Sequence, residues 1–527
     1  MRSNSFDICK AIKRIEALGL ILPVLGSATG CGASSVDIPI GSGAKQAGAG
    51  SATMKIEVPT QIPNILVDQT GYDTDSEKVA VFRGENLPDI FYVCEVDSGD
   101  IVYTGEILKS VYNEELGEYN SHGYFTDLKK PGRYYIYSDA TGDSYSFEIK
   151  NDIYDEVFNE ACKKYYVNRC GIGLSERYAG ERSRSACHTT MAKLQENPGT
   201  MIDVSGGWHM DGKAGRDTVM GCSIIENLLL AFEMNPSAFT DNADIPESGN
   251  GIPDILDEIK YEMDWLLKMQ DPKTGGEYGA ALTDAASDVD SFTAAVNVTP
   301  VDLEATISFA SAAARFSFFY QQYDPDFATI CIKASDRAWR CFLNNQKAEE
   351  DTAAFKAAAS LYRATGSQEY HQVMQDYFDR DNLEELFVRD ENIFIGAVTY
   401  LSIKHQVDVG VCTRLMKCLM KRAEEIAQKA STAGYLTTIS KDDKAFSKMM
   451  DEMRCLTITD HIIYNHEYTT IIENHAHYLM GMNPEAVNYI TDDTERTYET
   501  AGTSSLLSNP VNTSLFIFMI SVLENKA

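Results

Sequence analysis

The chain has 527 residues, and its 46 basic against 78 acidic side chains give a formal net charge of −32. This balance excludes a protein that wraps nucleic acid or docks on an anionic lipid surface through basic side chains. An apolar content of 44% with 24% charged residues indicates a folded chain, and the length exceeds what one ordinary core holds. Twelve cysteines are too few for a disulfide scaffold, so thiols with a specific partner are expected instead.

Residues 1–31 have the layout of a targeting segment. Basic residues precede an apolar run at 18–25, and small residues then lead to Cys31. The run is too short to span a bilayer, so it favours a removable export signal, with a short amphipathic helix as the alternative. The Ala-Thr-Gly-Cys ending resembles the lipobox of bacterial lipoproteins, which implies acylation of Cys31 at the cell surface, or else secretion. Membrane contact would then run through this lipid anchor alone. Residues 32–58, rich in Gly, Ser and Ala, are typical of a flexible tether.

Residues 59–150 alternate short β-rich runs with turn signals such as Ser-Gly and Pro-Gly. The clearest runs are ILV (65–67), KVAVF (78–82), FYV (91–93) and GRYYIY (132–137). Roughly 90 residues of this kind predict an all-β sandwich.

Residues 151–527 have helical periodicity instead, with apolar residues recurring at spacings of three and four. The clearest predicted helices are 252–270, 306–321, 326–344, 351–365, 411–431 and 470–481. A dozen helices with their loops would use about 31 residues each, which permits a large all-α barrel.

Several segments occur in the order of one known family. They are ILVDQTGY (65–72), YYVNRCGIGL (165–174), YAG (178–180) followed by SACHT (185–189), DVSGGW (203–208), IPESGNGIPDILDEIKYEMDWLLKMQ (245–270), YDPDFA (323–328), AAASLYRATG (357–366) and HYLMGMNP (477–484). Together they resemble glycoside hydrolase family 9, the inverting cellulases, in the subgroup with an N-terminal immunoglobulin-like domain. The resemblance implies a multidomain fold: an immunoglobulin-like sandwich packed on an (α/α)6 barrel, with a β-1,4-glucan cleft at one barrel end.

The position of the catalytic base departs from the family. Inverting hydrolysis needs a carboxylate that activates water and a protonated carboxyl that expels the leaving sugar. The family places the base in a Trp-x-Asp-Ala-Gly-Asp turn, and a gap-free alignment from Trp208 puts Met210 and Lys213 at its two aspartates. A thioether takes no proton at neutral pH, and a lysine is normally protonated already.

The acid side departs as well. If Asn512 is the family asparagine that opens the last helix, the catalytic glutamate position falls on Leu506. The stretch 485–505 contains no histidine where the family has a His-His-Arg substrate loop, and 447–450 reads Ser-Lys-Met-Met where Trp-Gly-Ser-Asn is expected. The sequence therefore predicts a family member that has lost hydrolysis and binds β-glucan or a partner.

Two other functions stay open. An active β-1,4-glucanase could use displaced carboxylates such as Asp211, Glu495 or Glu499, although a working pair needs a separation of roughly 6.5–9.5 Å. The chain could also be a structural or interaction protein without glycan affinity.

Four ligand-type residues suggest a metal centre. Cys170, Cys187, His188 and His209 lie within 40 positions, and two thiolates with two imidazoles satisfy tetrahedral zinc. Some members of the resembled subgroup carry zinc on an Arg-Cys-Gly cysteine, an Ala-Cys-His pair and the histidine of Gly-Gly-Trp-His, and all four positions are present. We expect structural zinc here. The resemblance also allows calcium, although no Asp-x-Asp-x-Asp-Gly loop occurs.

The three tryptophans bear on sugar binding. Trp265 and Trp339 lie in Ala- and Leu-rich helical runs and are expected in the core, whereas Trp208 lies near the base turn. Sugar rings stack on aromatic side chains, so a glucan platform would consist mainly of Tyr or Phe.

Overall fold

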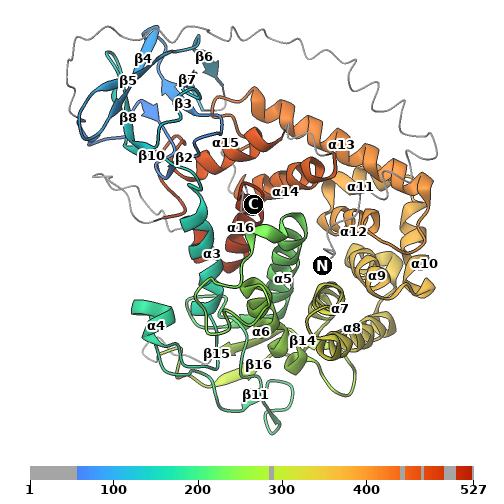
Figure 1. Ribbon diagram of the computed structural model, residues 1–527. Coiled ribbons are helices and arrows are strands. Elements are labelled where there is room, and N and C mark those ends of the chain that lie inside the picture. Colours follow the sequence, from blue (N-terminus) through green and yellow to red (C-terminus); the bar gives the residue numbers. More distant parts are fainter. Residues whose placement is uncertain are drawn as a thin grey trace.

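The structure is a computed structural model that describes residues 56–524 except 115, 284–289, 440–444, 464–467 and 492–505. The predicted export segment, Cys31 and most of the predicted tether lie outside the described residues. A β-sandwich precedes a barrel of helices, which confirms the predicted fold class (Figure 1). Among the helices described, none combines the length and the apolarity that crossing a membrane requires.

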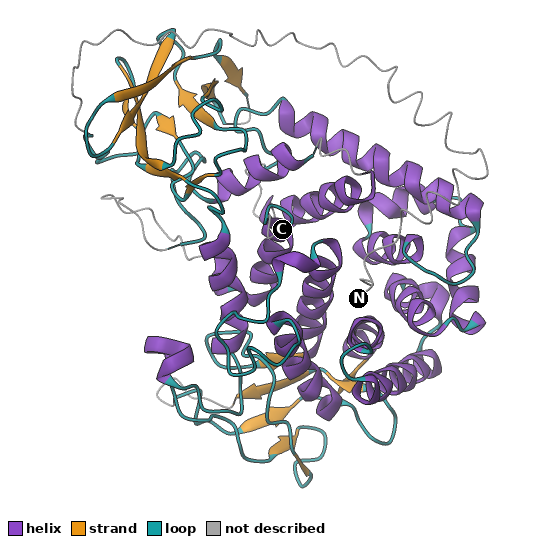
Figure 2. Ribbon diagram, in the orientation of Figure 1, coloured by secondary structure: helices purple, strands orange, loops and turns teal. Residues whose placement is uncertain are grey.

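The N-terminal sandwich consists of two mostly antiparallel sheets, drawn in orange in Figure 2. One has the order β1 (Ile65–Leu66), β3 (Val79–Arg83), β7 (Glu118–Tyr124) and β6 (Val111–Asn113). The other has the order β2 (Gly71–Tyr72), β10 (Phe147–Ile149), β8 (Gly132–Ser138), β4 (Ile90–Glu95) and β5 (Ile101–Glu106), with β9 (Gly142–Asp143) on β8. Alternate residues such as Phe91 and Val93 point inward and are fully buried, as a half-buried sheet requires.

Twelve helices of the described residues form an inner and an outer ring, which alternate along the chain (Figure 1). The inner ring is α5 (Thr218–Met234), α7 (Leu303–Tyr320), α9 (Thr352–Thr365), α12 (Glu391–Leu401), α14 (Ala445–Ile463) and α16 (Pro510–Ser521). The outer ring is α3 (Asp155–Val167), α6 (Asp254–Met269), α8 (Pro325–Asn345), α10 (Gln368–Phe378), α13 (Val409–Ser431) and α15 (Thr469–Leu479). Short α4 (Glu176–Ala179) and α11 (Leu383–Arg389) lie outside this pattern. The six predicted helices are all present, with ends shifted by a few residues.

Small sheets near one end of the barrel were not predicted. One has the order β12 (Met201–Ile202), β11 (Ala192–Leu194), β16 (Val296–Val298), β15 (Ala280–Thr283) and β13 (Arg216–Asp217), and another pairs β14 (Glu277–Tyr278) with β17 (Val301–Asp302). The expectation of a purely helical second domain was therefore too simple. Strands of two to four residues are too short to produce a recognisable alternation.

Because inner and outer helices alternate and reverse direction, the inner helices all begin at one end of the barrel, here called the mouth. A capping side chain begins five of them in the described residues: Asp217, Asp302, Asp351, Asp390 and Asn509 accept hydrogen bonds from the first-turn N–H groups of α5, α7, α9, α12 and α16. Such caps stabilise a helix start by about 1 kcal/mol each. The mouth therefore carries many carboxylates with a structural role.

Two of the family-like segments form the junction between sandwich and barrel. Asp68 lies in the segment 65–72 and His477 in the segment 477–484, and Asp68 Oδ2 lies 2.8 Å from His477 Nδ1. Both side chains are completely buried. The backbone N–H of Gln69 donates to the carbonyl of Met480 at 2.8 Å. These two segments therefore join the two domains.

Candidate active site and metal centre

The predicted metal ligands come together in a buried cluster. The ligand atoms of Cys170, Cys187, His188 and His209 lie within 4.8 Å of one another. The two Sγ atoms are 3.8 Å apart, Cys170 Sγ is 3.2 Å from His188 Nδ1, and Cys187 Sγ is 3.6 Å from His209 Nε2. A tetrahedron with bonds of about 2.3 Å to sulfur and about 2.0 Å to nitrogen has S–S and S–N edges of about 3.8 and 3.5 Å. The four side chains thus fit zinc in type and in spacing.

Backbone pairing holds two of these ligands side by side. The N–H of Cys170 donates to Gly207 O at 2.7 Å, and the N–H of His209 donates to Asn168 O at 2.9 Å. Gly207 has φ +77°, and a Cβ there would lie 2.7 Å from the Trp265 ring, so glycine is required on both counts. The end of α3 and the turn that follows Gly207 are therefore joined directly beneath the cluster.

His188 is oriented by a contact outside the cluster. Its Nε2 lies 2.8 Å from the carbonyl oxygen of Ser291, and its backbone has φ +47°, which is uncommon for a residue with a side chain. Donation of the Nε2 proton to this carbonyl leaves Nδ1 unprotonated toward Cys170. A carbonyl partner of this kind fixes the tautomer of a metal-ligating histidine.

The electrostatics of the cluster favour the metal-binding forms of Cys187 and His209, whereas the hydrogen bond with Cys187 and burial raise the pKa of Cys170. The hydrogen bond with Cys170 and those with His188 and His209 hold the pKa of Cys187 well below its usual range. Burial lowers the pKa of His209, which keeps its imidazole neutral. Thiolate and neutral imidazole are the protonation states that coordinate zinc. Among the residues the structure describes, no second group of His, Cys, Asp and Glu clusters in this way, and the calcium site stays a prediction.

The base turn begins one residue after His209. Met210 is 6% exposed and packs in the barrel core, and its N–H donates to Gly215 O at 2.8 Å. Lys213 is exposed, and its carbonyl accepts a hydrogen bond from the hydroxyl of Thr283 at 2.7 Å. The turn is therefore closed and anchored, but its two predicted base positions hold a buried thioether and a solvated ammonium group.

Asp211, the alternative base, is exposed and is engaged within its own turn. Its Oδ1 accepts the N–H groups of Lys213 at 3.0 Å and Gly215 at 2.8 Å. A side-chain oxygen that accepts backbone N–H groups two and four residues later stabilises the turn itself. This role explains the aspartate without reference to catalysis.

The acid side is described in part. Leu506 begins a short 3-10 helix (Leu506–Ser508), is half-buried, and donates its N–H to Tyr489 O at 2.8 Å. Glu495 and Glu499, the displaced acids considered above, lie outside the described residues. The stretch 447–450 lies within α14, where Met449 and Met450 are 1% exposed and belong to the core.

The tryptophans are all internal. Trp265 and Trp339 are fully buried, as predicted, and Trp208 is fully buried too, with its ring 4.7 Å from that of Tyr165. The N–H of Trp208 donates to Glu262 Oε2 at 2.7 Å, and burial raises the pKa of Glu262 to about 8. Trp208 therefore supports the base turn from below and offers no stacking surface to a sugar.

The comparisons with known proteins agree with this architecture. Residues 60–143 match the sequence model of the cellulase N-terminal ig-like domain, which defines the class of domain that the sandwich represents. Residues 154–502 match the model of glycosyl hydrolase family 9. The chain belongs to glycosyl hydrolase family 9.

Named relatives span most of the chain. A cellodextrinase of Butyrivibrio fibrisolvens is 26% identical over 486 residues, covering 82% of this chain and 86% of that protein. Endoglucanase D of Acetivibrio thermocellus is 27% identical over 443 residues, covering 76% and 68%. The solved structure of a metagenome-derived family 9 endoglucanase has a TM-score of 0.76 at 22% identity, covering 87% of this chain and 98% of that one, and it shows the same fold.

Proposed function

We propose that this chain is a family 9 protein that has lost glycoside hydrolysis and retains binding of β-1,4-glucan. The proposal is supported by the base turn, which the hydrogen bond from Met210 N–H to Gly215 O closes, and by the sequence alignment that puts Met210 and Lys213 at the two positions of the family aspartates. Neither side chain can take a proton from water at neutral pH, so water would not be activated there. Four described aspartates around the mouth are bound as helix caps.

The glucan part of the proposal rests on relatives. Their names give cellodextrin and endoglucanase activities, and a third relative, from Bacteroides ovatus, is named a xyloglucan-specific endo-β-1,4-glucanase at 24% identity. The shared substrate class is a β-1,4-linked glucan backbone. A purely structural protein without glycan affinity is the competing proposal, and a binding measurement separates the two.

Hydrolysis through a displaced base is the other alternative, and Asp211 is its sharpest test. The purified full chain is incubated with carboxymethyl cellulose and with cellotetraose, and released reducing ends are counted for the wild type and Asp211→Asn. We expect no release above a boiled control from either protein. Release by the wild type that disappears in Asp211→Asn would establish an active glucanase, and an unchanged release in the variant would locate the base elsewhere.

We further propose that Cys170, Cys187, His188 and His209 bind one structural zinc ion. Zinc would hold the end of α3 against the turn that begins at Trp208. The backbone hydrogen bonds from Cys170 to Gly207 and from His209 to Asn168 join the same two segments. A solved structure with this fold, 23% identical, is described as a zinc-binding triple mutant of a family 9 endoglucanase. The four ligands fill a tetrahedron, so the ion would have a structural rather than a catalytic role.

For the location of the protein, we propose export and lipid anchoring through Cys31. The support is the sequence pattern of residues 1–31 described above. Metabolic labelling with a palmitate analogue in a bacterial host should mark the wild type and not Cys31→Ala. Equal labelling of both proteins would contradict the anchor.

A further inference from the structure

The side chain of Arg184 contacts three parts of the structure beside the metal cluster. Its Nη1 donates to Cys187 Sγ at 3.5 Å, and its Nη2 donates to the carbonyl oxygens of Arg169 at 2.7 Å and Val167 at 3.3 Å. Its guanidinium carbon also lies 5.0 Å from the centre of the Phe292 ring. One half-buried cation therefore touches a proposed zinc ligand, the end of α3 and the loop that precedes β16.

Backbone pairing fixes the position of Arg184. Its N–H donates to Leu174 O at 3.0 Å, and its carbonyl accepts the N–H of Leu174 at 2.8 Å. The side chain thereby reaches the C-terminal end of α3, where unpaired carbonyl groups carry partial negative charge. A guanidinium group has five N–H donors in a rigid fork, so it can donate to two carbonyl oxygens and a sulfur at the same time.

The loop 290–293 contacts two histidines of the cluster. The carbonyl oxygen of Ser291 lies 2.8 Å from His188 Nε2. The ring of Phe292 packs edge to face against that of His209, with centroids 5.3 Å apart and planes at 62°. Since Arg184 contacts a third ligand, three of the four proposed ligands have an outer partner. Partners of this kind orient metal ligands and tune the affinity for the metal.

The same loop belongs to a hairpin at the mouth. The strands β15 and β16 pair with each other (Figure 1), and β15 also pairs with β13, which leads directly into the inner helix α5. Thr283, the last residue of β15, donates its hydroxyl to Lys213 O in the base turn at 2.7 Å. The hairpin therefore contacts the base turn just where β15 ends and the metal cluster shortly before β16 begins.

We propose that Arg184 is a positioning residue that couples zinc binding to the docking of the loop 290–293. The inference rests on the proposed structural zinc ion and concerns residues outside its four ligands. A charged donor holds the thiolate of Cys187 in the geometry that binds the metal. Because the same guanidinium group attracts the face of the Phe292 ring, a bound zinc ion and a docked loop favour each other. Zinc thereby keeps the hairpin in place beside the base turn.

The first test measures the zinc affinity of the full chain by competition with a chromophoric chelator, for the wild type and Arg184→Met. Methionine is a long, unbranched side chain without an N–H donor. The dissociation constant of zinc should rise about 10–100-fold, as it does when the outer partner of a metal ligand is removed. Arg182→Met changes an exposed arginine two residues earlier and is the matched control, with a dissociation constant within about twofold of the wild type.

Amide hydrogen exchange of the loop is the second readout. The N–H of Phe292 donates to Asp290 Oδ1 and that of Thr293 to Asp290 O, both at 3.0 Å, so both amides should exchange slowly while the loop is docked. Removal of zinc from the wild type with a chelator should accelerate their exchange at least about tenfold. Arg184→Met should do the same in the zinc-loaded protein.

Phe292→Leu is a second variant, which keeps the hydrogen bonds of Arg184 to Cys187 and to α3. It should raise the dissociation constant of zinc by about three- to tenfold, because coupling between metal binding and loop docking is reciprocal. A purely structural role of Arg184 would lower the melting temperature and leave the zinc affinity of the folded protein unchanged.

The proposal is overturned if Arg184→Met or Phe292→Leu binds zinc like the wild type, or if the loop exchanges equally fast with and without zinc. A wild type that holds no zinc by elemental analysis removes the metal site and this inference together. A wild type that holds zinc, with Arg184→Met unchanged in affinity, removes this inference alone. These results are independent of the tests of glucan binding and hydrolysis.

Discussion

Two neighbouring residues, His209 and Met210, belong to two regions that differ in function, the metal cluster and the base turn. His209 lies in a ligand cluster with the spacing of tetrahedral zinc, whereas Met210, the next residue, is a buried thioether at the position that the sequence alignment predicts for the base. The two residues share one stretch of backbone, in which the N–H of His209 donates to Asn168 O and the N–H of Met210 donates to Gly215 O. The proposed function holds that the architecture around the mouth persists while the proton chemistry is lost. Substitutions that change the structural contacts and the base turn separately test this comparison.

The largest effect is expected from the metal cluster. Cys187→Ser should abolish bound zinc and lower the free energy of unfolding by about 3–5 kcal/mol, because a structural metal contributes its binding energy to folding. Zinc content by elemental analysis and chemical denaturation measure both. Cys418→Ser changes a half-buried cysteine outside the cluster and serves as the control. A wild type without zinc, with both variants equally stable, would contradict the assignment.

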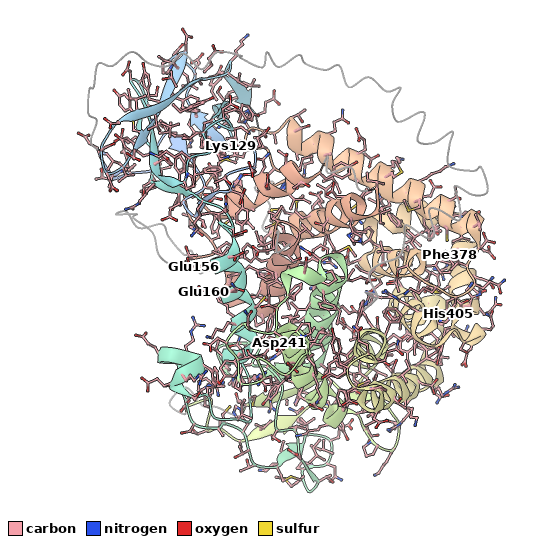
Figure 3. All side chains as sticks on the ribbon, in the orientation of Figure 1. Lys129, Glu156, Glu160, Asp241, Phe378 and His405 are labelled. Atoms are coloured by element: carbon pink, nitrogen blue, oxygen red, sulfur yellow. The ribbon has the colours of Figure 1, made fainter. Side chains whose placement is uncertain are left out.

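The junction of the two domains should come next. Asp68→Ala leaves His477 buried without its carboxylate partner, at a cost of about 3 kcal/mol in the free energy of unfolding. The exposed pair of Lys129 and Asp75, with Lys129 labelled in Figure 3, is the control, and Asp75→Ala should leave the melting temperature unchanged. Equal melting temperatures for the two variants would show that the domains are held by other contacts.

The pH dependence of stability should carry the signature of Glu473 at the same junction. Burial, with Asp73 and Glu77 nearby, raises the pKa of Glu473 to about 7, against an ordinary value of 4.5. A raised carboxyl pKa means that its contribution is complete below pH 4.5 and is lost as the pH rises through 7. Glu473→Gln should therefore match the wild type at pH 4.5 and exceed it by about 2 kcal/mol at pH 8. Denaturation at both pH values measures the difference, and a gain that is constant with pH would contradict the titration.

A smaller effect tests the structural role of the mouth acids. Asp390→Ala should cost about 1 kcal/mol in the free energy of unfolding, because the N–H of Ile393 loses its acceptor at the start of α12. Asp390→Asn keeps a capping oxygen and should recover most of the loss. If neither variant changes stability, the carboxylate has some role other than capping.

The sequence predicted the domain order, six helices and the four members of the metal cluster, because long periodic segments and distinctive motifs mark them. It did not predict the pair of Asp68 and His477, which are 409 positions apart and meet only when the domains dock. The caps at the mouth were not predicted, although each is an Asp or Asn directly before a helix, as Asp351 is before α9. Contacts between distant segments leave no local pattern.

The most direct test of the central claim follows cellotetraose by proton NMR in the presence of the wild type and of Asp211→Asn. Inverting hydrolysis releases the α-anomer of the new reducing end, which has a resolved signal before it mutarotates. We expect an unchanged spectrum for the wild type over a day, with Asp211→Asn indistinguishable from it. Growth of the α-anomer signal with the wild type, and its loss in Asp211→Asn, would contradict the account, since the base turn would then still perform the chemistry of its family.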